Sequence, residues 1–184
     1  MDMEKKIFVF VFCICALFLS CAKSPKDAVN VLVEDQVKKD CYHPETYEPV
    51  MTRVDSAFTP FDDPEFYDKT EQLIRLRNFV DFSFINCNGD IKKAKKQMNK
   101  ITEELKAMLG MERRFIGFKA QHRFRCEDNS GQTVFGDVML LLDKDMSQII
   151  MKYDMNSSEY KGVQAVYEEM TGEDLLKEGE GLWW

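Results

Sequence analysis

A run of apolar residues, Ile7 to Leu19, follows two lysines near the start of the chain and precedes Ser20 and Cys21. The run is thirteen residues long, whereas a membrane-spanning helix needs about 20. A basic start, a short apolar stretch and a small residue before the cleavage point are typical of a secretory signal. We therefore expect residues 1–20 to be a signal peptide, with an N-terminal membrane helix as the alternative.

Four later segments carry apolar residues at the three- and four-residue spacing of a helix. Each begins at a serine or aspartate, the residue types that cap helix starts. The predicted helices cover residues 24–40, 62–85, 90–110 and 157–172. Because the break at residues 86–90 is short, we expect the second and third helices to form an antiparallel hairpin.

The apolar spacing changes to every second residue between Arg114 and Cys126, which predicts a strand. Further strands are predicted at residues 47–58, 133–142 and 149–153. Short turns join the last three, so they are expected to pair antiparallel. The predicted fold is α+β: one early strand plus a three-stranded meander form an antiparallel sheet, packed against the N-terminal helix and the long helical hairpin.

The remaining chain is long enough for one domain with its own core. We expect residues 21–25 to be a tether, residues 26–172 a single α+β domain, and residues 173–184 an acidic tail. The tail ends in Trp183 and Trp184, the only tryptophans in the chain. This pair either docks on the sheet or contacts a partner.

The net charge of -7 argues against a nucleic-acid-binding protein. A basic cluster nevertheless lies on the solvent side of the third predicted helix. It consists of Lys92, Lys93, Lys95, Lys96 and Lys100. Several of these lysines fall near the helix start, where the helix dipole disfavours positive charge. The cluster is either a solvated helix face or a contact surface for an acidic partner.

The segment Phe18-Leu19-Ser20-Cys21 resembles the lipobox of bacterial lipoproteins. The resemblance implies cleavage before Cys21 and attachment of lipid to this cysteine, and Ala22 after it resembles the residue of lipoproteins sorted to the outer membrane. We therefore expect a lipid-anchored protein of the cell envelope, at the outer membrane. The short tether would keep the domain close to that membrane.

The order of helix, strand, helical hairpin and meander resembles the cystatin-like and nuclear-transport-factor-like group, as does the stretch Pro44-Glu45-Thr46-Tyr47-Glu48-Pro49-Val50. In that group a curved antiparallel sheet wraps around helices. The resemblance implies a cone between sheet and helices, which Asp55, His122 and Asp137 could line. An inward Asp137 would be a buried carboxylate with a raised pKa and a functional candidate.

Other candidate chemistry is sparse. His122 lies on an apolar strand face, so a core or interface histidine is favoured over a catalytic one. No phosphate-binding loop, nucleophile elbow or zinc-protease motif occurs, and we expect no metal and no cofactor. Cys41, Cys87 and Cys126 allow one disulfide with three choices of pair.

Asp55-Ser56-Ala57 resembles a three-residue O-glycosylation motif of some bacteria, which makes Ser56 a candidate sugar site.

These observations predict a non-enzymatic binding module, anchored by Cys21, that contacts a protein or glycan at the envelope and no nucleic acid. Two alternatives stay open: a small pocket enzyme or ligand carrier of the wrapped-sheet type, and an immunity or inhibitor protein.

Overall fold

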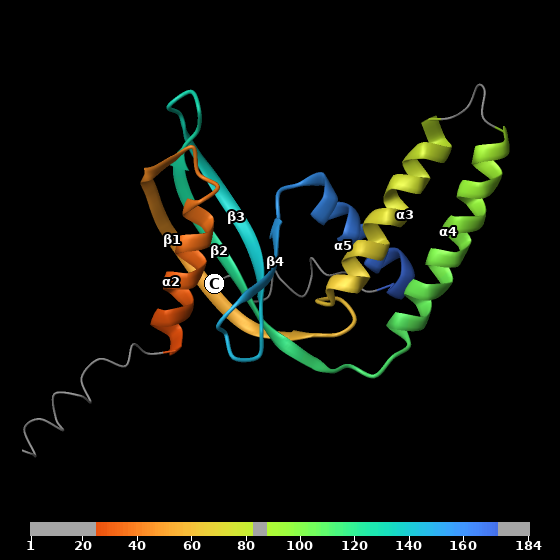
Figure 1. Ribbon diagram of the computed structural model, residues 1–184, viewed down its shortest axis with the longest axis horizontal. Helices are drawn as coiled ribbons and strands as arrows, with labels where there is room; N and C mark the ends of the chain where they lie inside the picture. The colour runs from red at the N-terminus through yellow and green to blue at the C-terminus, as the bar shows by residue number, and fades with distance from the viewer. Residues whose placement is uncertain (1–24, 83–87, 173–184) are drawn as a thin grey trace, which may run out of the picture.

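The computed structural model describes residues 25–82 and 88–172. Cys21, Cys87 and the tryptophan pair therefore lie outside the described residues. Within the described part, the chain is α+β, with a four-stranded antiparallel sheet and four helices (Figure 1). The elements are α2 Pro25–Lys38, β1 His43–Phe58, α3 Pro64–Phe82, α4 Asn88–Leu109, β2 Phe115–Glu127, β3 Thr133–Leu142, β4 Ile149–Asp154 and α5 Ser158–Thr171.

Local signals account for most element boundaries. The Ser157 side chain caps α5 by accepting a hydrogen bond from the Tyr160 backbone N–H, and Gly172 ends the helix in the left-handed conformation. At the start of α3, Asp63 accepts from the Glu65 N–H. Helix α4 begins at Asn88, so Asp90 is an acid within its first turn rather than its predicted cap.

The sheet has the order β1-β2-β3-β4, with every neighbouring pair antiparallel. Strand β1 begins at His43, earlier than the predicted residue 47, and its pairing with β2 is irregular around Pro44 and Pro49. Two prolines are tolerated there because β1 is an edge strand, where a missing N–H donor breaks no ladder on the open side.

Helix α2 covers one face of the sheet. Val29, Val33 and Val37 are buried and pack in a cluster that includes Ala120 of β2 and Leu140 of β3. These valines recur every four residues, so one stripe of the helix meets the apolar face of the sheet.

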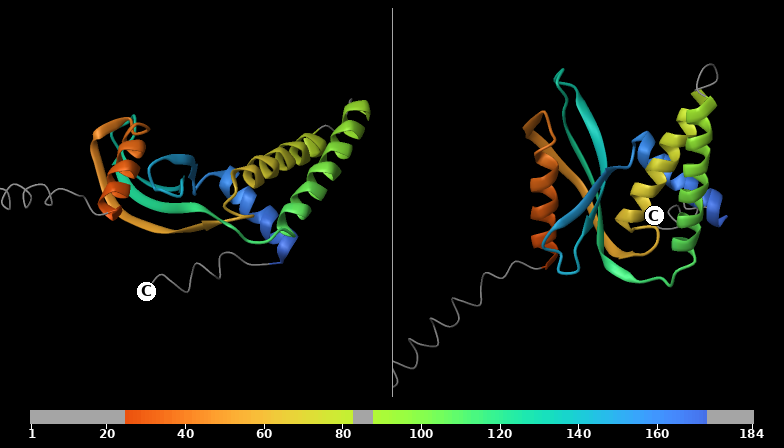
Figure 2. Two further views of the ribbon diagram at one scale, coloured as in Figure 1. Left: turned by 60° about the horizontal axis from the view of Figure 1, so that its bottom comes forward. Right: turned by 45° about the vertical axis from the view of Figure 1, so that its right-hand side comes forward.

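The hairpin of α3 and α4 forms a second core, mainly with α5. The buried side chains Phe66, Leu105 and Val163 come from the three helices in turn. Tyr67 of α3 stacks on Tyr153 of β4, with ring centroids 4.1 Å apart, and so joins this core to the sheet. Figures 1 and 2 show α2 and the hairpin at opposite ends of the described part of the molecule, with the end of α3 and the start of α4 pointing away from the sheet.

Candidate functional site

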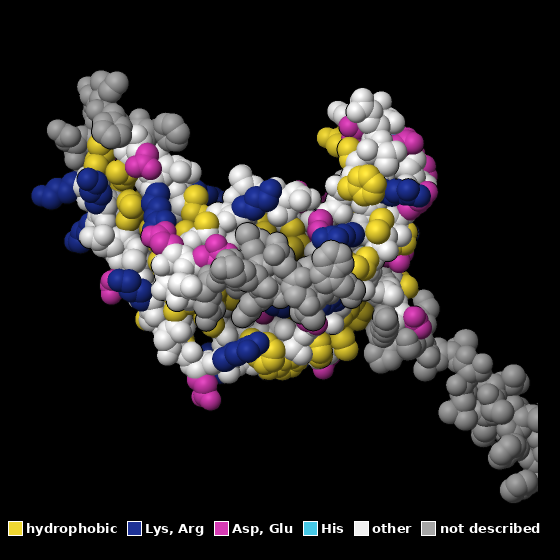
Figure 3. Space-filling view, turned by 180° about the vertical axis from the view of Figure 1, so that it is seen from behind, with side chains coloured by type: hydrophobic (Ala, Val, Ile, Leu, Met, Phe, Trp, Pro, Cys, Tyr) yellow, Lys and Arg dark blue, Asp and Glu magenta, His cyan; other side chains and the backbone are white. Residues whose placement is uncertain are grey.

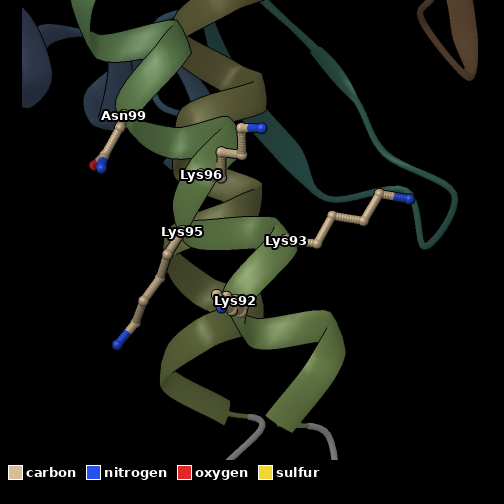
Figure 4. A pocket seen from close by; sticks show the side chains of 5 residues that line it. All are labelled: Lys92, Lys93, Lys95, Lys96 and Asn99. Atoms are coloured by element: carbon tan, nitrogen blue, oxygen red, sulfur yellow. The ribbon is translucent and has the colours of Figure 1, made fainter.

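Four neighbouring lysines in the first half of α4 form the surface that we call the lysine face: Lys92, Lys93, Lys95 and Lys96. All four are exposed. Together with Asn99 they line one surface hollow (Figure 4). Within the described residues, no hydrogen bond or ion pair joins any of these lysines to another side chain. Figure 3 shows basic side chains gathered on the outer side of the hairpin, next to its tip.

The opposite side of α4 explains why the lysines face solvent. Ala94, Ile101 and Leu105 are buried, and they occupy one stripe of the helix that packs against α3. This stripe sets the rotation of α4, because turning the helix would expose its apolar residues. The lysine face is therefore held by the core beneath it.

The position along α4 makes the lysine face electrostatically unfavourable for the isolated helix. Lys92 to Lys96 are the fifth to ninth residues of α4, so they lie just beyond the first turn, where the positive end of the helix dipole acts most strongly. The larger conflict is between Lys92 and Lys96, because like charges four residues apart destabilise a helix by about 0.2–0.5 kcal/mol. Asp90 is the acid of the first turn. A bound anion would relieve both the repulsion between the lysines and their conflict with the dipole.

Lys100 differs from the four lysines in being paired with an acid. Its Nζ lies 3.6 Å from an oxygen of Glu104, whose other oxygen accepts a 2.6 Å hydrogen bond from Lys69 of α3. The ammonium of Lys69 holds the pKa of the Glu104 carboxyl below its usual value. The predicted five-lysine cluster therefore divides into a paired Lys100 and the lysine face. Asn99 was not among the residues predicted from the sequence, although its position seven residues after Lys92 places it on the same side of the helix as that lysine.

His122 is fully buried on the α2 side of the sheet. Its Nε2 lies 2.6 Å from the Tyr47 hydroxyl and its Nδ1 lies 2.9 Å from the Thr52 hydroxyl. The ring also stacks on Phe124. Burial lowers the pKa of the imidazole, which favours the neutral ring. Both ring nitrogens are engaged inside the core, so this histidine is a structural link between β1 and β2.

The predicted pocket of Asp55, His122 and Asp137 does not form. His122 pairs with Val138 and shares the face that α2 covers, whereas Asp137 pairs with Arg123 on the other face. Asp55 pairs with Lys119 on that same opposite face. The physical reason is the two-residue alternation of strands, which sends neighbouring positions such as 137 and 138 to opposite sides.

Asp137 is shielded and fully engaged. Its carboxylate accepts hydrogen bonds from Gln121 Nε2, at 3.0 Å, and from Arg123 Nε, at 2.8 Å. Asp55 likewise forms an ion pair with Arg53, at 2.8 Å. The Asp137 contacts join β3 to β2, whereas the Asp55 pair lies within β1. Neither carboxylate is placed beside His122 for proton transfer.

The predicted sugar site and the acidic residues before α3 lie apart from the lysine face. Ser56 is exposed on edge strand β1, where its hydroxyl can be reached from solvent. The carboxylates Asp62 and Asp63 are occupied by Lys119 and by the start of α3. In residues 25–82 and 88–172, no three histidine, cysteine or acidic side chains lie close enough together to hold a metal ion.

Comparison with known proteins gives no relative: no family model, curated protein or solved structure matches the chain. None of the helices among the described residues is long and apolar enough to cross a membrane.

Proposed function

We propose that the protein is a lipid-anchored, non-enzymatic binding module of the cell envelope whose lysine face binds an acidic polysaccharide. The observation that carries this proposal is the lysine face itself: four exposed lysines, unpaired within the described residues, that line one shallow hollow and spread their side chains across the outer side of α4 (Figure 4). Cys21 supplies the anchor in this proposal, and α2 connects the anchor to the sheet.

The chemistry of the lysine face favours a flexible polyanion over a protein partner. Protein interfaces are enriched in arginine and aromatic residues and depleted in lysine. The hollow is lined only by lysines and Asn99, with no aromatic or arginine side chain among its lining residues. Lysine acts as a mobile point charge, which suits repeated carboxylate or sulfate groups along a sugar chain.

The position of the lysine face favours a ligand away from the anchoring membrane. The predicted tether precedes α2 in the sequence, and the start of α4 lies at the opposite end of the described part of the molecule from α2 (Figure 1). Headgroups of the membrane that holds Cys21 would therefore meet α2 before they met the lysine face. A polysaccharide extending through the envelope could reach it.

The geometry does not support the pocket-enzyme alternative, because its three candidate residues lie on two faces of the sheet. The immunity or inhibitor alternative requires a protein partner, so capture of a protein through the lysine face would favour it.

The test measures binding of the purified protein to alginate, an acidic polysaccharide, with neutral dextran as the reference. One variant replaces the four lysines of the lysine face by glutamine. Four contacts of about 0.5 kcal/mol each predict roughly 30-fold weaker binding. Binding of the unchanged protein should also weaken as salt is added.

A matched control removes the same charge elsewhere. Its four glutamine substitutions replace exposed lysines outside the lysine face: Lys39, Lys106, Lys144 and Lys161. This variant should bind alginate within about threefold of the unchanged protein. Equal losses in both variants would show that net charge alone drives binding. Absence of alginate binding, or selective capture of a protein through the lysine face, would contradict the proposal.

A further inference from the structure

Cys41 lies where the chain turns from α2 into β1. Its backbone N–H donates to the Lys38 carbonyl at 3.3 Å, and its Sγ lies 3.6 Å from the Val37 carbonyl oxygen. The side chain is half-buried and packs against the cluster beneath α2. Asp40, the preceding residue, contacts Lys152 of β4. The turn is thus attached to the sheet at a defined position.

Cys126 lies near the end of β2, one residue before Glu127, and Glu127 pairs with His43, two residues after Cys41. Because Cys126 is four residues after His122 on the same strand, its side chain lies on the face that α2 covers, where Cys41 also packs. The nearby Cys126 thiol also contributes to the raised pKa of Cys41.

Cys126 is buried at 7% exposure and borders a surface hollow together with Thr46 and Thr133. Both sulfur atoms are free thiols in this structure. Cys41 and Cys126 thus lie at the same corner of the sheet, which favours this one of the three pairings that the sequence allowed.

Near the two cysteines, the hydroxyl of Thr46 joins the backbone of β1 to the backbone of β2 through two hydrogen bonds. The Thr46 hydroxyl donates to the His43 carbonyl, at 2.8 Å, and accepts from the Glu127 N–H, at 2.9 Å. His43 and Glu127 are also paired across the two strands. The residues flanking both cysteines are therefore already fixed before any bond forms between the sulfurs.

We propose that Cys41 and Cys126 form a disulfide in the exported protein. The predicted signal peptide directs the chain to a compartment where disulfides persist. The oxidant is a disulfide donor, either a thiol–disulfide exchange protein or a small-molecule disulfide. One cysteine thiolate attacks the donor disulfide and releases a donor thiol, and the second thiolate then attacks the mixed disulfide and releases the other. Two electrons and two protons pass to the donor.

The bond would tie α2 to the second strand of the sheet. It would close a loop of about 85 residues, and long loops restrict the unfolded chain strongly. Helix α2 carries the predicted anchor, so the disulfide would couple the tether to the sheet covalently. The inference does not depend on what the lysine face binds.

Burial, the nearby Cys126 thiol and the negative charge of Asp40 raise the pKa of the Cys41 thiol to about 12. Only the thiolate attacks a disulfide. If Cys41 makes the first attack or resolves the mixed disulfide, oxidation of the folded, reduced protein should be slow at neutral pH and faster as the pH rises toward 9.

The test uses the purified full chain, reduced and then incubated with oxidised and reduced glutathione. After alkylation and proteolysis without reductant, mass spectrometry should find a peptide pair joined through Cys41 and Cys126. The C87A variant should give the same pair, whereas the C41A and C126A variants should lose it. A bond from Cys87 to either residue, or free thiols at both positions at every glutathione ratio, would overturn the inference.

Thermal unfolding supplies a second measurement, made on the oxidised and reduced forms of the unchanged protein, with C41A as the control. The oxidised form of the unchanged protein should melt roughly 10 °C above its reduced form. In C41A the same treatment should leave the melting temperature unchanged. Equal melting temperatures for the two forms of the unchanged protein would show that the bond, even if formed, does not restrain this fold.

Discussion

At the scale of single residues, the environment assigns roles that residue type alone leaves open. His122 has both ring nitrogens within hydrogen-bonding distance of hydroxyl groups and no exposed surface. A histidine next to a carboxylate in a pocket would be a candidate base, but Asp137 projects from the other face. The imidazole instead forms a buried polar cluster with two hydroxyl groups of β1. These hydrogen bonds form only when β1 and β2 pair in the correct register, so they stabilise that register.

The buried imidazole predicts a pH dependence of stability. Burial lowers the pKa of His122 in the folded protein, whereas in the unfolded chain its pKa stays near the ordinary histidine value of 6.5. Below that pH, His122 binds a proton in the unfolded chain more readily than in the folded protein. The contribution of His122 to the free energy of unfolding is therefore complete above about pH 6.5 and decreases as the pH falls. We expect urea unfolding to show a lower free energy of unfolding at pH 5.5 than at pH 7.5.

Two substitutions separate this effect from general acid destabilisation. The chain has two histidines, and His43 is half-exposed beside Glu45. In His122→Gln the decrease in unfolding free energy between pH 7.5 and 5.5 should shrink, although the variant is less stable overall. In His43→Gln the decrease should match that of the unchanged protein. An undiminished decrease in the His122 variant would assign the pH dependence to other groups.

At the scale of elements, α4 combines a strong core stripe with an unfavourable charge pattern. Its apolar residues place Ala94 and Leu105 in the core. Its lysines gather in the second and third turns, where Lys92 and Lys96 place like charges four residues apart. Sequences that only need to form a helix have no reason to keep this arrangement, so we infer that the lysine face serves binding at some expense of stability.

This inference predicts opposite effects of one substitution on stability and on binding. Lys92→Glu should stabilise the protein by about 0.2–0.5 kcal/mol, because it replaces the repulsion between Lys92 and Lys96 by an attractive pair four residues apart. The same change should weaken alginate binding. Lys106→Glu, in the last turn, should instead lower stability. Chemical denaturation and alginate titration of both variants check this pattern, and a destabilised Lys92→Glu protein would indicate a structural role for Lys92.

At the scale of the whole molecule, the fold separates two cores. Helix α2 and the sheet form one, and α3, α4 and α5 form the other, joined through the stacked rings of Tyr67 and Tyr153. Helix α2 and the start of α4 lie at opposite ends of the described part of the molecule (Figure 2). In the proposed function, one end is tied to a membrane and the other meets its ligand.

This separation predicts that anchoring and binding are independent. Cys21→Ala should release the protein from the membrane fraction, because the lipid acceptor is lost. The released protein should bind alginate with unchanged affinity, since the substitution is remote from the lysine face. Fractionation of cells followed by titration of the soluble protein checks both results. Continued membrane retention of the variant would refute the lipobox interpretation.

Local patterns in the sequence were sufficient to predict which segments form helices and which form strands. Strand β3 covers the predicted residues 133–142, and α5 lies between Ser157 and Gly172 as its cap signals indicate. Periodicity and capping act within a few residues, so they can be read without knowing the fold. The exposed lysine face on the third predicted helix followed from the same reasoning, apart from the pairing of Lys100.

Contacts between distant segments needed the folded chain. Three features depend on strand register and on how the cores close. They are the packing of the α3–α4 hairpin on α5, the separation of His122 from Asp137, and the placement of Cys41 and Cys126 at one corner of the sheet. A shift of one residue in register moves every side chain of a strand to the other face. Local periodicity says which positions share a face of one strand, but only pairing between strands says which residues meet.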